Sequence, residues 1–170
     1  MGRYIVMGVT IALALILKTS IFPHLAIGGV RPDLVALVIV AFALSEGPDT
    51  GMRLGFVAGL VQDLLGGPAT VVGTGALFGL IIGWAAGASR PFIAANVEFG
   101  SLAVALLGAM GLTGGQVLIA GLLGANNISL GALLLLTLGT GLYSVVLSPL
   151  VLWAAKTALS PFPKATIGQL

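Results

Sequence analysis

The sequence lacks most of what a soluble protein or a metalloenzyme needs. Charged residues make up only 7% of its 170 residues, against about 25% in a typical soluble domain, so the chain cannot cover a surface that faces water. There is no cysteine, which excludes disulfides and thiolate metal sites. His24 is the single histidine, which excludes a metal cluster built from several histidines. With 58% hydrophobic residues, the chain is expected to be an integral membrane protein.

Known catalytic arrangements are missing as well. An intramembrane aspartyl protease needs two facing aspartates, and only Asp63 lies even partly inside a predicted span. A serine hydrolase needs a histidine beside its serine, but His24 follows a proline in a loop. We therefore expect no enzyme activity, no metal and no cofactor. The basic residues are scattered, so no nucleic-acid partner is expected either.

Apolar runs separated by turn residues predict six membrane-spanning helices in one domain that covers residues 1–170. The expected fold is an all-α polytopic membrane bundle. A span needs about 20 apolar residues, and the second and third runs are shorter. Either their ends are frayed or they are packed inside protein, where a short helix is tolerated. The predicted spans lie near residues 4–22, 33–45, 51–65, 72–88, 98–124 and 129–158.

The first run is also compatible with a cleaved signal peptide, because Arg3 precedes an apolar stretch. Lys18 and Thr19 interrupt the position where a cleavage site with small residues would follow, which favours an uncleaved span.

The basic residues predict an orientation. Six spans place both termini on the same side of the membrane. Basic residues are enriched on the cytoplasmic side of membrane proteins, so we expect both termini in the cytoplasm. That side then carries Arg3, Arg53, Arg90, Lys156 and Lys164, whereas the outer side carries Lys18 and Arg31.

Two rows of glycines follow the third and fourth predicted spans. A spacing of four residues places glycines along one face of a helix, where they allow another helix backbone to approach closely. We therefore predict that both rows are faces for helix packing or for binding a partner. Whether each row meets a helix of this chain or of another protein stays open. The rows are Gly51, Gly55 and Gly59, and Gly75, Gly79, Gly83 and Gly87.

Asp63 needs compensation for its charge. It lies near the C-terminal end of the third predicted span, where the helix dipole disfavours an anion. Lys18, Arg31 and the backbone amides around residues 66–70 are the available partners. We predict a structural salt bridge or cap at the outer face, with Arg31 as the partner and Asp33 close by.

Other polar residues within the spans raise the possibility of a carrier, because such residues often mark a substrate pathway. The last two spans carry almost no charge, which disfavours an ion-coupled carrier. Hydrogen bonding between helices is the simpler role for these residues. They are Gln62, Thr113, Gln116 and Thr137.

The stretch from Arg31 to Leu65 resembles the MreD family of rod shape-determining proteins. The matching features begin with Pro32-Asp33-Leu34 at the start of the second span. They continue with Gly47 and Gly51, then Gly55-Phe56, Gly59-Leu60 and Asp63-Leu64. The family pattern has a Leu-Gly pair before the next span, and this sequence lacks it.

The resemblance implies a non-enzymatic subunit of the cell-elongation machinery in the bacterial inner membrane, active in cell-wall synthesis and rod shape. It implies binding to an MreC-like protein, association with RodA and its class B penicillin-binding transpeptidase, and contact with MreB or RodZ as well as membrane lipid. We predict that the glycine faces form a rigid scaffold that holds the transmembrane helix of the MreC-like partner.

The family is also similar to the six-helix substrate-binding subunits of energy-coupling-factor vitamin transporters, which supplies an alternative function. Such a subunit would need a ligand pocket with aromatic side chains. Tyr4, Trp84 and Trp153 lie near predicted inner ends, where aromatic residues anchor a helix at the membrane surface. Those subunits also offer small residues four apart on the first helix, and Gly8 with Ala12 is a poor version of that pattern. The MreD resemblance is therefore favoured.

Overall fold

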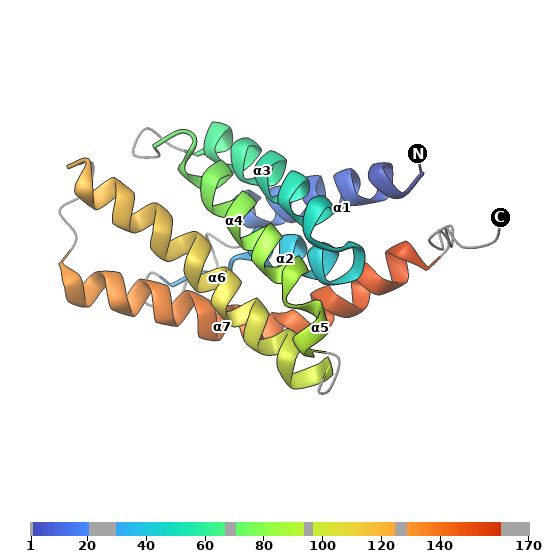
Figure 1. Ribbon diagram of the computed structural model, residues 1–170. Coiled ribbons are helices and arrows are strands. Elements are labelled where there is room, and N and C mark those ends of the chain that lie inside the picture. Colours follow the sequence, from blue (N-terminus) through green and yellow to red (C-terminus); the bar gives the residue numbers. More distant parts are fainter. Residues whose placement is uncertain (1, 21–29, 67–70, 94–96, 125–128, 161–170) are drawn as a thin grey trace.

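The computed structural model describes residues 2–20, 30–66, 71–93, 97–124 and 129–160, and the elements of this part of the chain are all helices, joined by short connections (Figure 1). The prediction of an all-α membrane bundle is confirmed. His24, Lys164 and residues 67–70, which entered the predictions, lie outside the described residues. The helices are α1 (Gly2–Ser20), α2 (Leu34–Glu46), α3 (Pro48–Leu65), α4 (Thr74–Ala88), α5 (Arg90–Ile93), α6 (Val97–Leu122) and α7 (Leu130–Leu159).

Helix α2 is the centre of the bundle. Every residue from 34 to 43 is buried, and α1, α3, α4, α6 and α7 all pack against the helix. Its sequence is apolar all round because no side of it faces water, which is the pattern of a fully enclosed helix. A helix of 13 residues suffices here, since its ends are covered by protein. Burial therefore explains the short second span.

Three helical segments are long and apolar enough to cross a membrane: Gly2–Ser20, Phe99–Leu122 and Gly131–Ala158. Helices α2 and α4 are apolar but shorter. Large apolar side chains such as Leu107, Leu142 and Val146 are exposed on the outside of the bundle. Lipid is the solvent that suits such a surface.

Two details differ from the predicted spans. Helix α3 begins at Pro48, ahead of the predicted start at residue 51, because proline suits the first helical turn and Gly47 turns the chain with a φ of 107°. The short helix α5 follows directly after α4 and was expected as a loop.

Helix α7 contains Pro149 and bends along its length (Figure 1).

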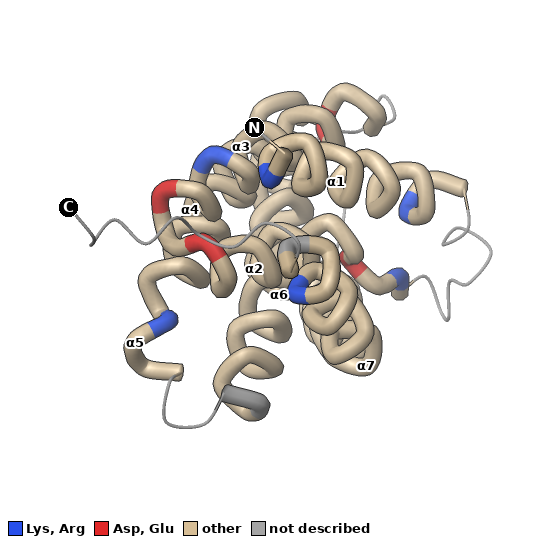
Figure 2. Tube along the Cα trace, turned by 90° about the vertical axis from the view of Figure 1, so that its right-hand side faces the viewer, with Lys and Arg blue, Asp and Glu red and all other residues tan. Residues whose placement is uncertain are grey.

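Successive helices, apart from the short α5, run in alternating directions, so the bundle has two ends (Figure 1). The start of α1, the α2–α3 turn, α5 and the end of α7 lie at one end, which we call the terminal end. The end of α1, the start of α2 and the end of α3 lie at the opposite end. Long stretches of each helix carry no charged residue (Figure 2), so the ionic interactions are confined to these two ends.

Candidate functional site

The two glycine rows face each other within the chain. Helices α3 and α4 run antiparallel, so the rows meet in reverse order. A Cβ on Gly55 would overlap the carbonyl oxygen of Gly79, and a Cβ on Gly79 would overlap that of Gly55. Gly51 and Gly83 meet in the same reciprocal way, Gly59 lies against the Gly75 carbonyl, and Gly87 lies against Pro48.

This close approach answers the question of what the glycine rows contact. The backbones of α3 and α4 touch along the hairpin, and van der Waals contact is the main source of helix association in lipid. Because the rows are covered by each other, a foreign helix cannot dock on them. A surface for a partner must therefore lie elsewhere on this hairpin or on its neighbours.

Asp63 is buried and caps the start of α4. Its carboxylate accepts hydrogen bonds from the backbone N–H groups of Gly73 at 2.8 Å, Gly75 at 2.9 Å and Ala76 at 3.3 Å. The free N–H groups and the positive dipole end of α4 stabilise the anion that the end of α3 disfavours. A Cβ at Gly75 would overlap the Asp63 Oδ1 atom, so glycine is required there as well.

The predicted pairing of Asp63 with Arg31 is wrong. Within the described residues, Arg31 forms no salt bridge with Asp63, and its side chain is exposed just before α2. Asp63 points into the α3–α4 hairpin, where the amides of residues 73–76 already satisfy it. The compensation comes from the backbone, one of the predicted alternatives, through Gly73 and the first turn of α4, whereas residues 67–70 lie outside the described residues.

Asp33 joins four helices at the end of the bundle that lies away from the terminal end, the same end as Asp63. Its Oδ1 atom accepts a hydrogen bond from Lys18 Nζ of α1 at 2.9 Å and caps α2 through the Ala36 amide at 3.2 Å. Its Oδ2 atom accepts from the Thr113 hydroxyl of α6 at 3.3 Å, and its own N–H donates to the Ser144 hydroxyl of α7 at 2.9 Å. The cation beside Asp33 is thus Lys18 and not Arg31.

The polar side chains within the spans bond to one another between helices. Gln62 donates to Gln116 Oε1 at 3.3 Å, and Gln116 donates to Asp63 at 3.4 Å, which ties α6 to the hairpin. The Thr137 hydroxyl is buried and makes no hydrogen bond in the described part of the chain. Among the described residues, no three His, Asp or Glu side chains are grouped as a metal site would require.

Helix α1 is fastened to α2 at both ends. Arg3 forms a salt bridge with Glu46 at the terminal end, and Lys18 forms one with Asp33 at the opposite end. Between these two clamps, α1 packs on α2 and touches α7. It stands away from α3, so a groove runs along the bundle between them.

This groove, the α1–α3 groove, is an apolar trough with a volume of about 440 Å³. Gly8 lies in its α1 wall, and a Cβ there would meet nothing within 4 Å. A second groove of about 320 Å³ lies between α1 and α7. The α1–α3 groove is lined by Tyr4, Gly8, Ile11, Ala12 and Leu15 of α1 and by Thr50, Arg53, Leu54, Val57 and Val61 of α3.

Comparison with protein families identifies one over nearly the whole chain. Residues 1–159 match the family described as rod shape-determining protein MreD. Searches of curated proteins and of solved structures return no match. The family match covers α1 to α7 and so includes the hairpin, both aspartate caps and the α1–α3 groove.

Proposed function

Because this chain belongs to the MreD family of rod shape-determining proteins, we propose that it is a non-enzymatic membrane scaffold that holds the transmembrane helix of an MreC-like protein. The proposed site is the α1–α3 groove. Through the MreC-like partner, the chain would join RodA and its class B penicillin-binding transpeptidase, together with MreB or RodZ, in cell-wall synthesis.

The carrying observation is the shape and chemistry of the groove. Gly8 and Ala12 lie one helical turn apart on its α1 wall, where small residues let a foreign helix approach the backbone. Val57 and Val61 of α3 provide an apolar opposite wall. Lipid tails are as apolar as these side chains, so close shape fit is what favours a protein helix over lipid.

The α3 wall of the groove is rigid for a physical reason. Its other face is fixed against α4 by the close backbone contacts of Gly51, Gly55 and Gly59. The end of α3 is held by Asp63, which binds the start of α4. A wall that does not rearrange loses less conformational entropy when a partner docks. The glycine contacts thus support docking without touching the partner.

We place the terminal end of the bundle in the cytoplasm of a bacterium, with the chain in the inner membrane. The described basic residues favour this orientation, because Arg3, Arg53, Arg90 and Lys156 lie at the terminal end, whereas Lys18 and Arg31 lie at the opposite end.

Tyr4, Trp84 and Trp153 are all exposed near helix ends at the terminal end, which suits anchors in the headgroup region. The outward position of Trp84 and Trp153 favours the scaffold over a vitamin-binding subunit, which would turn aromatic rings toward a ligand.

Co-purification from native membranes tests the proposal. Gly8→Leu and Ala12→Leu fill the groove with a large side chain and should each release the MreC-like partner while the chain still elutes as a folded species. Gly121→Leu is the matched control, because Gly121 is an exposed glycine on α6 with nothing within 4 Å of its Cβ position. Unchanged recovery of the partner from both groove variants would contradict the proposal.

A further inference from the structure

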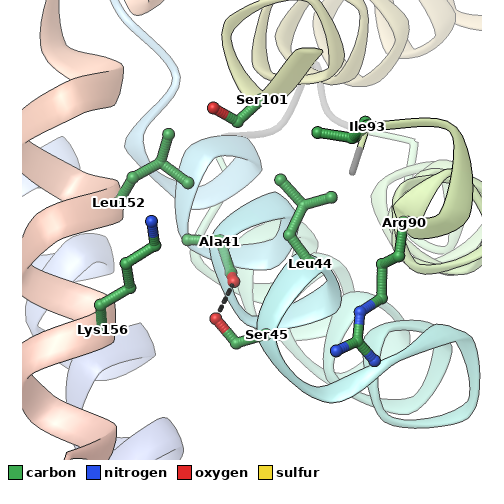
Figure 3. Close-up of a pocket in the computed structure, with 8 residues that line it drawn as sticks. All are labelled: Ala41, Leu44, Ser45, Arg90, Ile93, Ser101, Leu152 and Lys156. Carbon is green, nitrogen blue, oxygen red and sulfur yellow. Dashed lines mark hydrogen bonds between the residues drawn. The ribbon is translucent and has the colours of Figure 1, made fainter. Parts of the chain in front are cut away.

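A cavity at the terminal end differs in chemistry from the two grooves beside α1. It has a volume of about 240 Å³ and opens between α2, α5, α6 and α7 (Figure 3). Arg90 of α5 and Lys156 of α7 approach it from opposite walls (Figure 3). Leu44, Ile93 and Leu152 form its apolar lining. The α1–α3 groove, in contrast, has a single cation among its lining residues.

We propose that this cavity binds the phosphate headgroup of an anionic phospholipid. Arg90 and Lys156 would hold the phosphate, and the apolar lining would receive the carbon atoms next to it. This site is separate from the α1–α3 groove and does not depend on the proposed MreC-like partner.

The positive charge of the cavity is not cancelled within the described chain. Its salt bridges join Arg3 with Glu46 and Lys18 with Asp33, and neither Arg90 nor Lys156 takes part in one. The C-terminal ends of α2, α4 and α7 each contribute roughly half a negative charge. The two full positive charges of the side chains exceed the sum of these helix-end charges.

The surroundings indicate a lipid rather than a soluble anion. Phe92 of α5 and Phe99 at the start of α6 expose 86% and 77% of their surface. Such aromatic rings beside basic residues are typical of the interface between headgroups and acyl chains. The terminal end is therefore at the level where lipid phosphates lie, and basic pockets between helices at this level bind anionic headgroups.

The two cations also select among lipids. A zwitterionic headgroup carries an amine that Arg90 and Lys156 would repel, whereas phosphatidylglycerol and cardiolipin carry no such group. The Arg90 guanidinium lies beside the α2–α3 turn, since a Cβ at Gly47 would lie 3.3 Å from its Nη1 atom. An arginine positioned in this way can donate two hydrogen bonds to one phosphate.

Native mass spectrometry tests the proposal. The full chain is mixed in detergent with cardiolipin, phosphatidylglycerol or phosphatidylethanolamine, and the lipid that stays bound after the detergent is removed is measured. The native chain should retain the two anionic lipids and release the zwitterionic one. Each of Arg90→Gln and Lys156→Gln should weaken retention roughly fivefold, and the double variant about 25-fold, since each basic residue near a lipid surface contributes about 1 kcal/mol.

Arg53→Gln is the matched control, because Arg53 is an exposed cation at the same end that lines the α1–α3 groove instead. It should leave retention unchanged, and Arg90→Lys, which keeps the charge but loses the paired hydrogen bonds, should retain more lipid than Arg90→Gln and less than the native chain. An equal loss in Arg53→Gln would show that only the overall charge matters and would overturn the site. Displacement of the lipid by millimolar inorganic phosphate would overturn the lipid assignment in favour of a soluble anion.

Discussion

Gly55 of α3 and Gly79 of α4 lie so close together that a β-carbon on either would overlap the carbonyl oxygen of the other. The same reciprocal contact occurs one turn away at Gly51 with Gly83, and one turn away on the other side a β-carbon on Gly59 would overlap the carbonyl oxygen of Gly75. In ordinary helices a glycine is a local weakness, about 1 kcal/mol worse than alanine. Here the absence of side chains is what allows the two backbones to touch.

Gly55→Ala should therefore lower stability although alanine is the better helix former. Overpacking at a tight contact costs about 1–3 kcal/mol, which exceeds the gain in helix propensity. Thermal unfolding in detergent, followed by the fluorescence of the two tryptophans, measures the change. Gly8→Ala is the control with open space around its Cβ and should be neutral or slightly stabilising. A Gly55→Ala protein at least as stable as Gly8→Ala would refute the packing argument.

Asp63→Ala should destabilise the hairpin by about 3 kcal/mol, because the buried N–H groups of Gly75 and Ala76 and the partly buried N–H of Gly73 lose their acceptor. Asp63→Asn keeps one acceptor oxygen and should cost less. Asp49→Ala removes an exposed carboxylate from the first turn of α3 and should cost at most about 1 kcal/mol. Chemical denaturation of the three variants provides the comparison, and equal costs for Asp63→Ala and Asp49→Ala would contradict the capping role.

Lys18→Gln should destabilise the protein by about 2 kcal/mol, since it leaves the buried Asp33 carboxylate without its cation. The Lys18 side chain is partly exposed, which keeps this cost below that of a fully buried pair. Asp33→Asn can still accept the hydrogen bond from Ala36. The double variant with Lys18→Gln and Asp33→Asn should thus lose less stability than the sum of the losses in the two single variants.

Additive costs in that double-variant cycle would show that Lys18 and Asp33 do not act as a pair. Arg31→Gln serves as the companion variant, because Arg31 precedes Asp33 closely in sequence but is exposed. It should leave the unfolding temperature unchanged.

Features that lie within a single helix could be predicted from the sequence. Apolar runs predicted the long helices, and the spacing of the glycines predicted two flat faces on the third and fourth spans. The need of Asp63 for a compensating cation or hydrogen-bond donors followed from its position at a helix end. These features depend on local periodicity and on the helix dipole, which a linear sequence displays directly.

Contacts and distances between different helices could not be predicted in this way. Arg31 was predicted as the partner of Asp63, but no salt bridge joins the two residues, and α1 brings Lys18 to the nearby carboxylate of Asp33. The meeting of the two glycine rows depends on the register of the α3–α4 hairpin. The α1–α3 groove depends on how far α1 stands from α3, which is set by the salt bridges at its two ends.

The central claim is that the α1–α3 groove holds the helix of an MreC-like protein. Site-directed photocrosslinking tests this claim most directly. The sequence contains no cysteine, so a single introduced cysteine can carry the crosslinker without background. Ala12→Cys and Val57→Cys place it on the two walls of the groove, whereas Leu142→Cys places it on the exposed surface of α7. We predict crosslinks to the MreC-like protein from the two groove positions and none from residue 142. Crosslinks from residue 142 alone, or equally from all three positions, would contradict the account.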